Sequence, residues 1–335
     1  MRVLQVLLSP RIGGAESAAA SLAEVWEGRG LACHMTYLDR DRPGGALARA
    51  FGLREAIREV QPDVIVSHSA LPNVYSRLVA GAIPVICVLH SAARDFDDPK
   101  LKFAERLLQH QTRSVVAVSS AQREEYVALF PKQRVVLIPN GVASRFAPAA
   151  QFDLRGPVVT IGRVVAQKDP ALWSAVTRAI CVEHGSARFE WFGPFSPGVL
   201  STDDERWHHR SDSPAVFRGP TKNVDEVLRG AAVLFHPARR EAHSVALLEA
   251  AATGLPIVCS SDVAATMPQW LPMSVFSTGD ARDATRAVRA VLTDLESWRE
   301  RAIGAVPQVV DNFGIERTAR TYESEMVRAR QAGVS

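Results

Sequence analysis

The chain has 335 residues, of which 47% are hydrophobic and 22% are charged, and its formal net charge is +3. This length favours two domains over one core, and the composition excludes a disordered chain. The small positive charge does not predict nucleic-acid binding, although it suits anionic ligands or an anionic membrane surface. Four scattered cysteines without CxxC spacing favour a reduced, cytoplasmic setting.

Short apolar runs rich in β-branched residues alternate with helical stretches in the first half of the chain. Strands are expected at 2–9, 31–38, 63–68, 84–89, 114–118 and 134–138. Helices are expected at 15–28, 45–59, 98–111 and 120–129. The first apolar run is short and leads into two glycines, which is typical of a buried strand and not of a signal peptide.

The second half continues the same alternation. Strands are expected at 157–161, 188–192, 215–217, 232–235, 256–260 and 274–276. Helices are expected at 170–183, 223–230, 244–253, 281–293 and 314–331. Alternating strands and helices predict an α/β fold with parallel sheets that are covered on both faces.

A stretch without periodicity, 141–156, follows the turn signal Pro139-Asn140-Gly141 and predicts a domain boundary. We expect a Rossmann-like domain at 1–150, a second one at 151–310, and a C-terminal helix within 311–335 that packs back towards the first domain. Both domains would be doubly wound, with a cleft between them. Ligands in such sheets bind outside the carboxyl ends of the strands, so residues just after strands are the candidates for function.

Two glutamates stand eight positions apart in the stretch RREAHSVALLEAAATGLP. Glu241 follows an expected strand, and Glu249 lies about two turns into an apolar helix that begins near Ser244. Eight helical positions leave side chains about 80° and about 12 Å apart, so the carboxylates are not expected to share a proton or a metal ion. A buried carboxylate needs hydrogen bonds, and the hydroxyl groups of a ligand would supply them to Glu249. The alternative places Glu241 on the surface and Glu249 in a buried ion pair.

Two cations follow the first expected strand of the second domain. Arg163 comes directly after Gly162, and Lys168 lies in the same loop. A planar guanidinium and a lysine point charge at a strand's carboxyl end suit a diphosphate. The alternative is two solvated surface cations.

The first domain offers glycines and histidines at strand ends. Gly13 and Gly14 allow the backbone to approach a ligand at a helix N-terminus, although the turn is not the GxGxxG of a nicotinamide site. His68 and His90 each end a strand, and His90 is the better candidate because a loop follows it. A structural role remains the alternative for both histidines, and a plain tight turn for the glycines.

Paired aspartates occur in Asp39-Arg40-Asp41 and in Asp95-Phe96-Asp97. Such pairs can bind a divalent metal ion, but these lie in polar loops without further ligands. We therefore predict solvated charges there and assign no metal site.

These motifs, taken in chain order, resemble the retaining GT-B glycosyltransferases of family 4, also called glycosyl transferases group 1. The resemblance covers nearly the whole chain. Its motifs are GGAE, VLH, SVVAVSS, RVVLIPNGV, IGRVVAQKD, FEWFGP, VFRGPTKNV and E-x7-E followed by EAAATGLPIVCSSDV.

The resemblance implies a hexosyltransferase-type enzyme that uses a nucleoside diphosphate sugar, with a UDP-sugar favoured. The acceptor would be a hydroxyl group of a lipid-linked molecule or a saccharide, in the synthesis of a bacterial surface polysaccharide or lipopolysaccharide. Transfer would retain the anomeric configuration and need neither a metal ion nor another cofactor. The enzyme would be cytoplasmic, with a possible peripheral contact at the inner face of the cell membrane, and nucleic acid is not an expected partner.

The resemblance also implies roles for single residues. Arg163 and Lys168 would hold the donor diphosphate, and Glu241 would contact the donor sugar beside His90; these four are the implied catalytic residues. Glu249 would accept hydrogen bonds from the ribose. The implied donor-binding set is Gly13, Gly14, Gly162, Arg163, Lys168, Gly219 (at the base pocket), Glu241, His243, Ser244, Val245 and Glu249.

The chain departs from the family pattern around the donor sugar. Ala242 stands where glycine is usual, His243 replaces a common aromatic residue, and Ala143 follows IPNGV where aspartate is common. Two other functions stay open: a nucleotide-sugar epimerase or hydrolase of the same fold, and a non-catalytic GT-B scaffold protein.

A basic amphipathic helix is a further expectation within 98–111. Cations alternate there with apolar residues, a pattern that suits contact with an anionic membrane surface. The alternative is a solvated helix over the core. The residues are Lys100, Lys102 and Arg106 with Leu101, Phe103, Leu107 and Leu108.

Overall fold

The computed structural model describes residues 1–10, 13–39, 45–91, 93–150, 152–183 and 185–331. By its internal contacts the chain divides into two units. The first joins residues 1–141 to residues 315–335, and the second comprises residues 142–314. Each unit has one six-stranded sheet in which all paired strands run parallel. The α/β class predicted from the sequence is confirmed.

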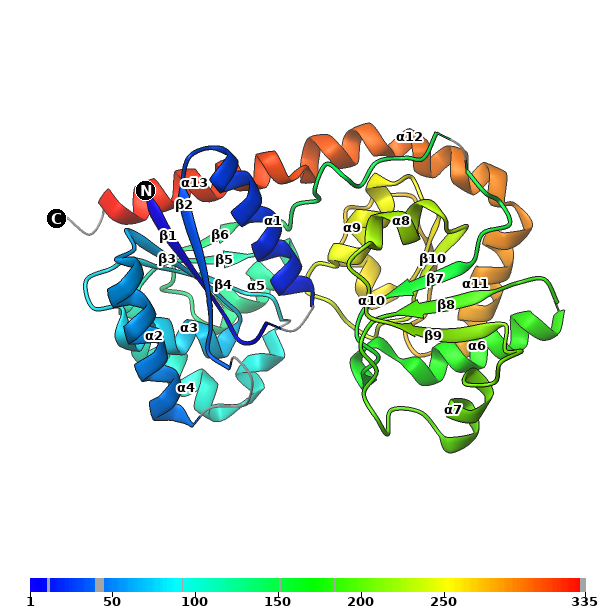
Figure 1. Ribbon diagram of the computed structural model, residues 1–335, viewed down its shortest axis with the longest axis horizontal. Helices are drawn as coiled ribbons and strands as arrows, with labels where there is room; N and C mark the ends of the chain where they lie inside the picture. Colours follow the sequence, from blue (N-terminus) through cyan, green and yellow to red (C-terminus); the bar gives the residue numbers. More distant parts are fainter. Residues whose placement is uncertain (11–12, 40–44, 92, 151, 184, 332–335) are drawn as a thin grey trace. The chain divides into compact units, whose positions relative to one another are not determined.

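The first unit has the strand order β2-β1-β3-β4-β5-β6 (Figure 1). Its strands are β1 Arg2–Leu7, β2 Ala32–Tyr37, β3 Val64–His68, β4 Val85–Val88, β5 Thr112–Ala117 and β6 Val135–Leu137. Its helices are α1 Gly14–Gly28, α2 Ala46–Val60, α3 Ala70–Val79, α4 Pro99–Leu108, α5 Ser120–Leu129 and α13 Ile315–Gln331, with 3₁₀ turns at Ala93–Asp97 and Gln109–Gln111.

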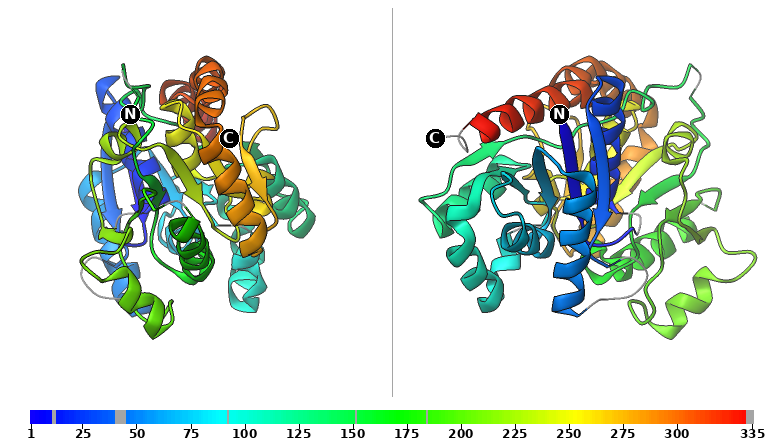
Figure 2. Two further views of the ribbon diagram at one scale, coloured as in Figure 1. Left: turned by 90° about the vertical axis from the view of Figure 1, so that its right-hand side faces the viewer. Right: turned by 60° about the vertical axis from the view of Figure 1, so that its left-hand side comes forward.

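Helices α1 and α13 pack against each other in this unit. Trp26 of α1 is fully buried, donates through Nε1 to the Ala319 carbonyl at 3.4 Å, and meets the Tyr322 ring edge-on at 5.9 Å. Arg29 pairs with Glu316 and Glu323 of α13. The C-terminal helix is therefore part of the structure that covers the first sheet (Figures 1 and 2).

A buried ion pair joins α3 to α4. The Arg77 guanidinium donates to both carboxylate oxygens of Glu105, at 2.9 and 2.6 Å, and Glu105 is 5% exposed. Helix α3 is absent from the sequence prediction. Pro72 falls in its first turn, where a missing N–H costs nothing.

The second unit has the strand order β12-β11-β10-β7-β8-β9. Its strands are β7 Val158–Ile161, β8 Phe189–Phe192, β9 Ala215–Gly219, β10 Val233–His236, β11 Ile257–Ser260 and β12 Ser274–Phe276. Its helices are α6 Pro170–Glu183, α7 Thr202–His208, α8 Val224–Arg229, α9 Val245–Ala252, α10 Ser261–Ala264, α11 Ala281–Thr293 and α12 Leu295–Phe313, with a 3₁₀ turn at Ala166–Lys168.

Helix α12 is also absent from the prediction, because it contains Gly304 and Pro307, which disfavour a helix interior. Its buried residues Leu295, Ala302 and Val309 recur every seven positions, which places them on one face. The helix packs against α9. Tertiary packing therefore outweighs the local preference.

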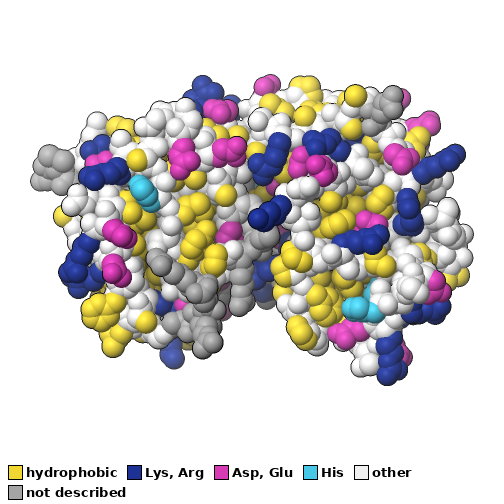
Figure 3. Space-filling view, viewed as in Figure 1, with side chains coloured by type: hydrophobic (Ala, Val, Ile, Leu, Met, Phe, Trp, Pro, Cys, Tyr) yellow, Lys and Arg dark blue, Asp and Glu magenta, His cyan; other side chains and the backbone are white. Residues whose placement is uncertain are grey.

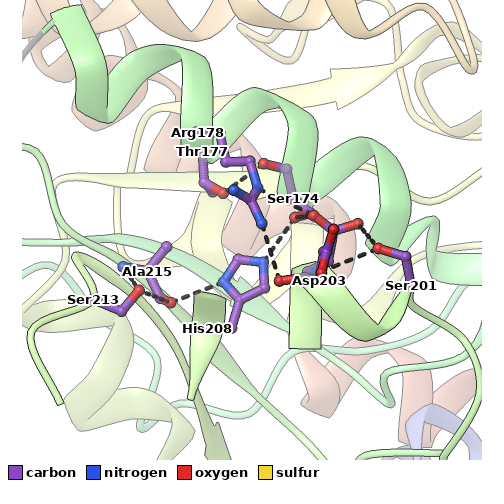
Figure 4. Close-up of polar contacts among 9 residues, drawn as sticks. Ser174, Thr177, Arg178, Ser201, Asp203, His208, Ser213 and Ala215 are labelled. Carbon is purple, nitrogen blue, oxygen red and sulfur yellow. Dashed lines mark hydrogen bonds and ion pairs between the residues drawn. The ribbon is translucent and has the colours of Figure 1, made fainter. Parts of the chain in front are cut away.

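Helix α7 is held to α6 by a polar network (Figure 4). The Ser174 hydroxyl lies 2.9 Å from His208 Nε2 and 2.7 Å from Asp204 Oδ1, and His208 Nδ1 lies 2.9 Å from the Ala215 carbonyl oxygen. Arg178 of α6 also pairs with Asp204. The network ties both helices to the end of the sheet at β9.

Candidate functional site

Three glycines lie at the carboxyl ends of neighbouring strands of the second sheet. Gly162, Gly193 and Gly219 have φ of 137°, 154° and 77°, which side chains other than glycine rarely adopt. Gly193 donates through its backbone to Gly219 at 2.9 Å, and a Cβ at Gly193 would clash with the Gly162 carbonyl. The glycines allow close packing at the carboxyl ends of β7 and β8 and leave open space beside Gly219 at the end of β9, where ligands of parallel sheets bind.

Lys168 and Glu241 form an ion pair across 73 positions of sequence. Strand β7 pairs with β10, so the loops that follow these strands meet at one edge of the sheet. Side-chain exposure is 17% for Lys168 and 15% for Glu241. A Cβ at Gly162 would lie 3.2 Å from Lys168 Cε, so this glycine makes room for the lysine.

His236, at the end of β10, extends the pair inward. Its Nε2 lies 3.5 Å from Glu241 Oε1 and 3.5 Å from the hydroxyl of Ser244, which caps the N-terminus of α9. Burial opposes ionisation of Glu241, but Lys168 and His236 lower the pKa of this carboxyl to about 2. Burial, and then Lys168, lower the pKa of His236. A carboxylate and an ammonium group are thus fixed together beside a neutral imidazole.

Glu249 is a buried carboxyl in α9, 9% exposed. Burial raises its pKa to about 8, against the opposing charge of Arg145. No residue in the described part of the chain donates a hydrogen bond to this carboxyl. The helix begins at Val245, so Glu249 lies just over one turn into it and not two turns, as the sequence suggested.

The expected relation between the two glutamates does not hold, because Glu241 lies outside the helix. The angular argument from helical spacing therefore does not apply to the pair. Another observation supports the conclusion that the two carboxyl groups do not act together. Glu241 interacts with Lys168 and His236, whereas the charge that opposes the pKa shift of Glu249 is that of Arg145.

The two loops of this site are also joined by backbone and side-chain contacts. Arg239 Nε lies 2.9 Å from Asp169 Oδ2, and the Arg239 backbone donates to the Gln167 carbonyl at 2.9 Å. Gln167 Nε2 donates to the Arg240 carbonyl at 3.0 Å. These contacts hold the Lys168 loop against the Glu241 loop.

The remaining predicted donor residues of this unit occupy separate positions. Arg163 is exposed at the end of β7, and Gly219 ends β9 with open space beside its Cα. His243 is buried against the Phe313 ring at 5.5 Å, and burial lowers its pKa to about 4. Val245, the first residue of α9, is partly exposed.

In the first unit, the structure links the two strand-end histidines. His68 Nδ1 lies 2.9 Å from His90 Nε2, and the rings stack at 5.2 Å. Both residues line a small cavity with Asn140, Thr318 and Tyr322. His68, which the sequence ranked second, is thus the direct neighbour of His90.

Gly13 and Gly14 lie at the N-terminus of α1, as expected from the sequence. The backbone of Gly13 is extended, so no unusual φ requires glycine there. The absent side chain would instead allow a ligand to approach the backbone closely. Glu16 in the first helical turn brings a carboxylate close to it. Of the paired aspartates, Asp41 lies outside the described residues. Asp39 was predicted to be a solvated charge, but its side chain is 14% exposed and pairs with Arg49 at 2.8 Å, while Asp95 accepts a hydrogen bond from Ser91 at 2.5 Å.

Three residues near the candidate site were missed from the sequence. His236 could have been found by the rule that selected His68 and His90, because it also ends a strand. Gly193 carries the signal of the motif FEWFGP, in which glycine follows a strand. Arg145, the charge that opposes the raised pKa of Glu249, gave no signal because nothing local links it to α9.

Two family models match the chain. Glycosyltransferase Family 4 matches residues 12–145, and Glycosyl transferases group 1 matches residues 156–294.

Two curated proteins are similar in sequence. The gpi3 subunit of phosphatidylinositol N-acetylglucosaminyltransferase from Schizosaccharomyces pombe is 28% identical over 67% of this chain and 50% of that protein. The UDP-Gal:alpha-D-GlcNAc-diphosphoundecaprenol alpha-1,3-galactosyltransferase of Escherichia coli is 23% identical over 62% of this chain and 60% of that protein. The chain thus matches between half and two thirds of the length of these relatives.

Among solved structures, Anabaena HepE in complex with UDP and glucose is similar over 98% of this chain and 99% of that one. The TM-score is 0.78 and the sequence identity is 14%. A likeness at this identity establishes the common fold.

Proposed function

Because the chain belongs to the family 4 glycosyltransferases with the GT-B fold, we propose that it transfers a sugar from a nucleoside diphosphate sugar to an acceptor hydroxyl group. The observation that carries this proposal is the arrangement that follows β10. Glu241, which precedes α9, is paired with Lys168, and α9 contains the buried carboxyl of Glu249, to which no described residue donates a hydrogen bond. The ion pair suits a diphosphate and its sugar, and the buried carboxyl suits ribose hydroxyl groups.

The donor diphosphate would bind Arg163 and Lys168 at the end of β7. An ammonium group has three donors, so Lys168 can keep Glu241 and still contact a phosphate oxygen. The Ser244 and Val245 end of α9 adds a positive helix dipole for an anion. Fixed cations and this dipole would carry the charge of the leaving group, and we therefore propose transfer without a metal ion.

Glu241 would accept hydrogen bonds from the donor sugar, and Glu249 from the ribose. The open backbone at Gly219 leaves room for a base. We favour a UDP-sugar, because the similar Anabaena protein was solved with UDP and glucose and the similar Escherichia coli enzyme is named for UDP-Gal.

We propose that transfer retains the anomeric configuration, as the family resemblance implies. The acceptor oxygen would form a bond to the anomeric carbon on the face from which the diphosphate leaves. The acceptor proton would pass to a phosphate oxygen of the departing nucleotide. The family resemblance also implies that His90 would contact the transferred sugar.

A screen of UDP-, GDP- and CDP-sugars by thermal shift tests the donor. A sugar nucleotide at 100 times its Kd is expected to stabilise the fold by about 2.7 kcal/mol, with the largest shift for a UDP-sugar. NMR of the product, formed in the presence of saccharide and polyprenyl-diphosphate acceptors, would then report the anomeric configuration.

Donor turnover that needs no acceptor would contradict transfer and favour an epimerase or hydrolase. Donor binding without any turnover would favour a scaffold protein. The absence of a shift with every sugar nucleotide would contradict the proposed site itself.

We further propose that the acceptor is lipid-linked, in surface-glycan synthesis at the inner face of the cell membrane, and that α4 touches the membrane. Phe103 and Leu107 are 67% and 56% exposed on one face of α4, and Lys100 and Arg106 of the same helix are also exposed. Leu108, expected on the same face, is buried.

Exposed apolar residues continue onto the neighbouring helices. Phe51 of α2 is 69% exposed and Leu78 of α3 is 58% exposed, and α3 contacts both α2 and α4. Figure 3 shows hydrophobic side chains over the lower part of α2. Basic residues among exposed apolar ones suit an anionic bilayer surface. No helix in the described ranges has the length and apolar content to cross a bilayer.

Co-sedimentation with vesicles tests the surface. The chain is expected to pellet with vesicles that contain anionic phospholipid, and Phe103→Ser with Leu107→Ser is expected to reduce the bound fraction severalfold, because both side chains would insert. Val182→Ser is the matched control, since Val182 is 86% exposed in the other unit. The proposal would be contradicted if the bound fraction fell equally in both variants, or if the unmodified chain did not bind anionic vesicles.

A further inference from the structure

Three side chains form a hydrogen-bonded row in the first unit. Gln5 lies on β1, His68 ends β3 and His90 follows β4, and these strands are adjacent in the sheet. Gln5 is 0% and His68 is 1% exposed, while His90 is partly exposed. His68 Nε2 lies 3.0 Å from Gln5 Oε1, and His68 Nδ1 lies 2.9 Å from His90 Nε2.

The amide of Gln5 fixes the direction of these hydrogen bonds. Its Nε2 donates to the Ala19 carbonyl at 2.9 Å and faces Cys33 Sγ at 3.4 Å. A carbonyl only accepts, so the amide cannot be turned around, and Oε1 must face His68 as an acceptor.

His68 must therefore carry its proton on Nε2, in order to donate to Gln5. Burial, and then the neighbouring His90, lower the pKa of His68 well below its ordinary value, so the ring is neutral and Nδ1 is an acceptor. His90 must then donate from Nε2. Burial also lowers the pKa of His90, to about 4, which leaves its Nδ1 without a proton.

We propose that Gln5 and His68 are positioning residues that hold His90 as the neutral Nε2–H tautomer, so that His90 Nδ1 accepts a hydrogen bond from a sugar hydroxyl group. A ring held in this way offers no proton to a phosphate at Nδ1. This selects the hydroxyl-bearing part of the donor, and not its diphosphate, as the partner of His90. The choice of partner rests on the proposed function, whereas the tautomer does not.

Long-range proton–nitrogen NMR of the full chain, labelled with ¹⁵N-histidine, tests the tautomer without any ligand. His68 and His90 are both expected as Nε2–H tautomers at pH 7.5. His208 is the internal control, because its Nδ1 faces the Ala215 carbonyl at 2.9 Å and must carry a proton (Figure 4). A proton on His90 Nδ1 would overturn the proposal.

Two variants test whether His68 sets the tautomer. The Asn side chain of His68→Asn can place an amide oxygen near the former Nδ1, so His90 is expected to stay an Nε2–H tautomer. His68→Leu has no acceptor, so His90 is expected to become a mixture of both tautomers. If His90 remained entirely the Nε2–H tautomer in His68→Leu, the positioning role would be refuted, even if His68→Asn behaves as expected.

Binding of UDP and of UDP-glucose separates this inference from the proposed function. Loss of one hydrogen bond corresponds to about 3- to 10-fold in affinity. His68→Leu is expected to weaken UDP-glucose binding by that factor and to leave UDP binding unchanged, while His68→Asn is expected to change neither. Equal weakening of both ligands would overturn the choice of partner. If neither ligand binds the unmodified chain, the donor proposal fails, and the NMR result still decides the tautomer.

Discussion

Replacement of Glu249 by glutamine is expected to stabilise the free chain at pH 8 and to weaken the binding of a nucleoside diphosphate sugar at least tenfold. The folded pKa of about 8 lies above the ordinary value of 4.5. The folded state therefore prefers the neutral acid, and this contribution to stability is present below pH 4.5 and is lost as pH rises towards 8. One unit of pKa corresponds to about 1.4 kcal/mol. We expect a gain of about 1–3 kcal/mol at pH 8, less than the full pKa shift would give, because no described residue donates a hydrogen bond to the amide oxygen.

Calorimetry between pH 5 and 8.5 measures this effect. The unfolding temperature of the Glu249→Gln chain is expected to exceed that of the unmodified chain at pH 8, and the difference should shrink towards pH 5. Donor affinity of the unmodified chain should increase towards pH 8, since ribose hydroxyl groups would stabilise the carboxylate, and the variant should lack this trend.

Glu105→Gln is the matched control for a buried carboxyl. Glu105 is also buried, but it receives two hydrogen bonds from Arg77. Its replacement leaves the buried Arg77 cation without a carboxylate. We expect the free energy of unfolding to fall by about 3 kcal/mol at pH 5 and at pH 8 alike. A Glu249→Gln chain that is less stable at pH 8, or that binds the donor normally, would contradict the role of Glu249.

Lys168→Met is expected to lower the rate of sugar transfer by about 100- to 1000-fold, because one fixed donor to the developing charge is lost. The substitution also leaves Glu241 in a low-dielectric site without its cation, so we expect a loss of about 2 kcal/mol in stability. Initial rates and thermal unfolding measure the two effects. Lys222→Met is the control, since Lys222 is exposed in the same unit.

The double variant Lys168→Met with Glu241→Gln separates the two roles of Lys168. Removal of both charges should recover most of the stability, because no unpaired carboxylate remains. The transfer rate should stay low, because the diphosphate still lacks its cation. A double variant that regains activity, or a single variant within tenfold of the unmodified rate, would show that Lys168 acts only on folding.

The structure also accounts for two residues that depart from the family pattern, His243 and Ala242. His243 is buried against Phe313, and its lowered pKa keeps the ring neutral, so it packs as an aromatic residue would. Ala242 is buried and has no positive φ, so glycine is not required at this position. Neither substitution needs a change in the backbone around Glu241.

The sequence alone determined the alternation of strands and helices and the α/β class. It also located Arg163, Lys168 and Glu241 in loops after strands. These features follow from local periodicity and from glycines and prolines at turns, which act over a few residues. Helices α3, α7, α10 and α12 were missed, and α12 shows why: Pro307 argues against a helix locally, while packing on α9 stabilises it.

Which side chains pair with each other was decided by the tertiary structure. The pairing of Lys168 with Glu241 spans 73 positions, and that of His68 with His90 depends on two adjacent strands. Chain spacing does not fix such contacts, because sheet order sets which strand ends meet. Burial raises the pKa of both carboxyls, but the contacts that folding brings to each decide its ionisation. Lys168 and His236 lower the pKa of Glu241, whereas Glu249 has no hydrogen-bond donor among the described residues.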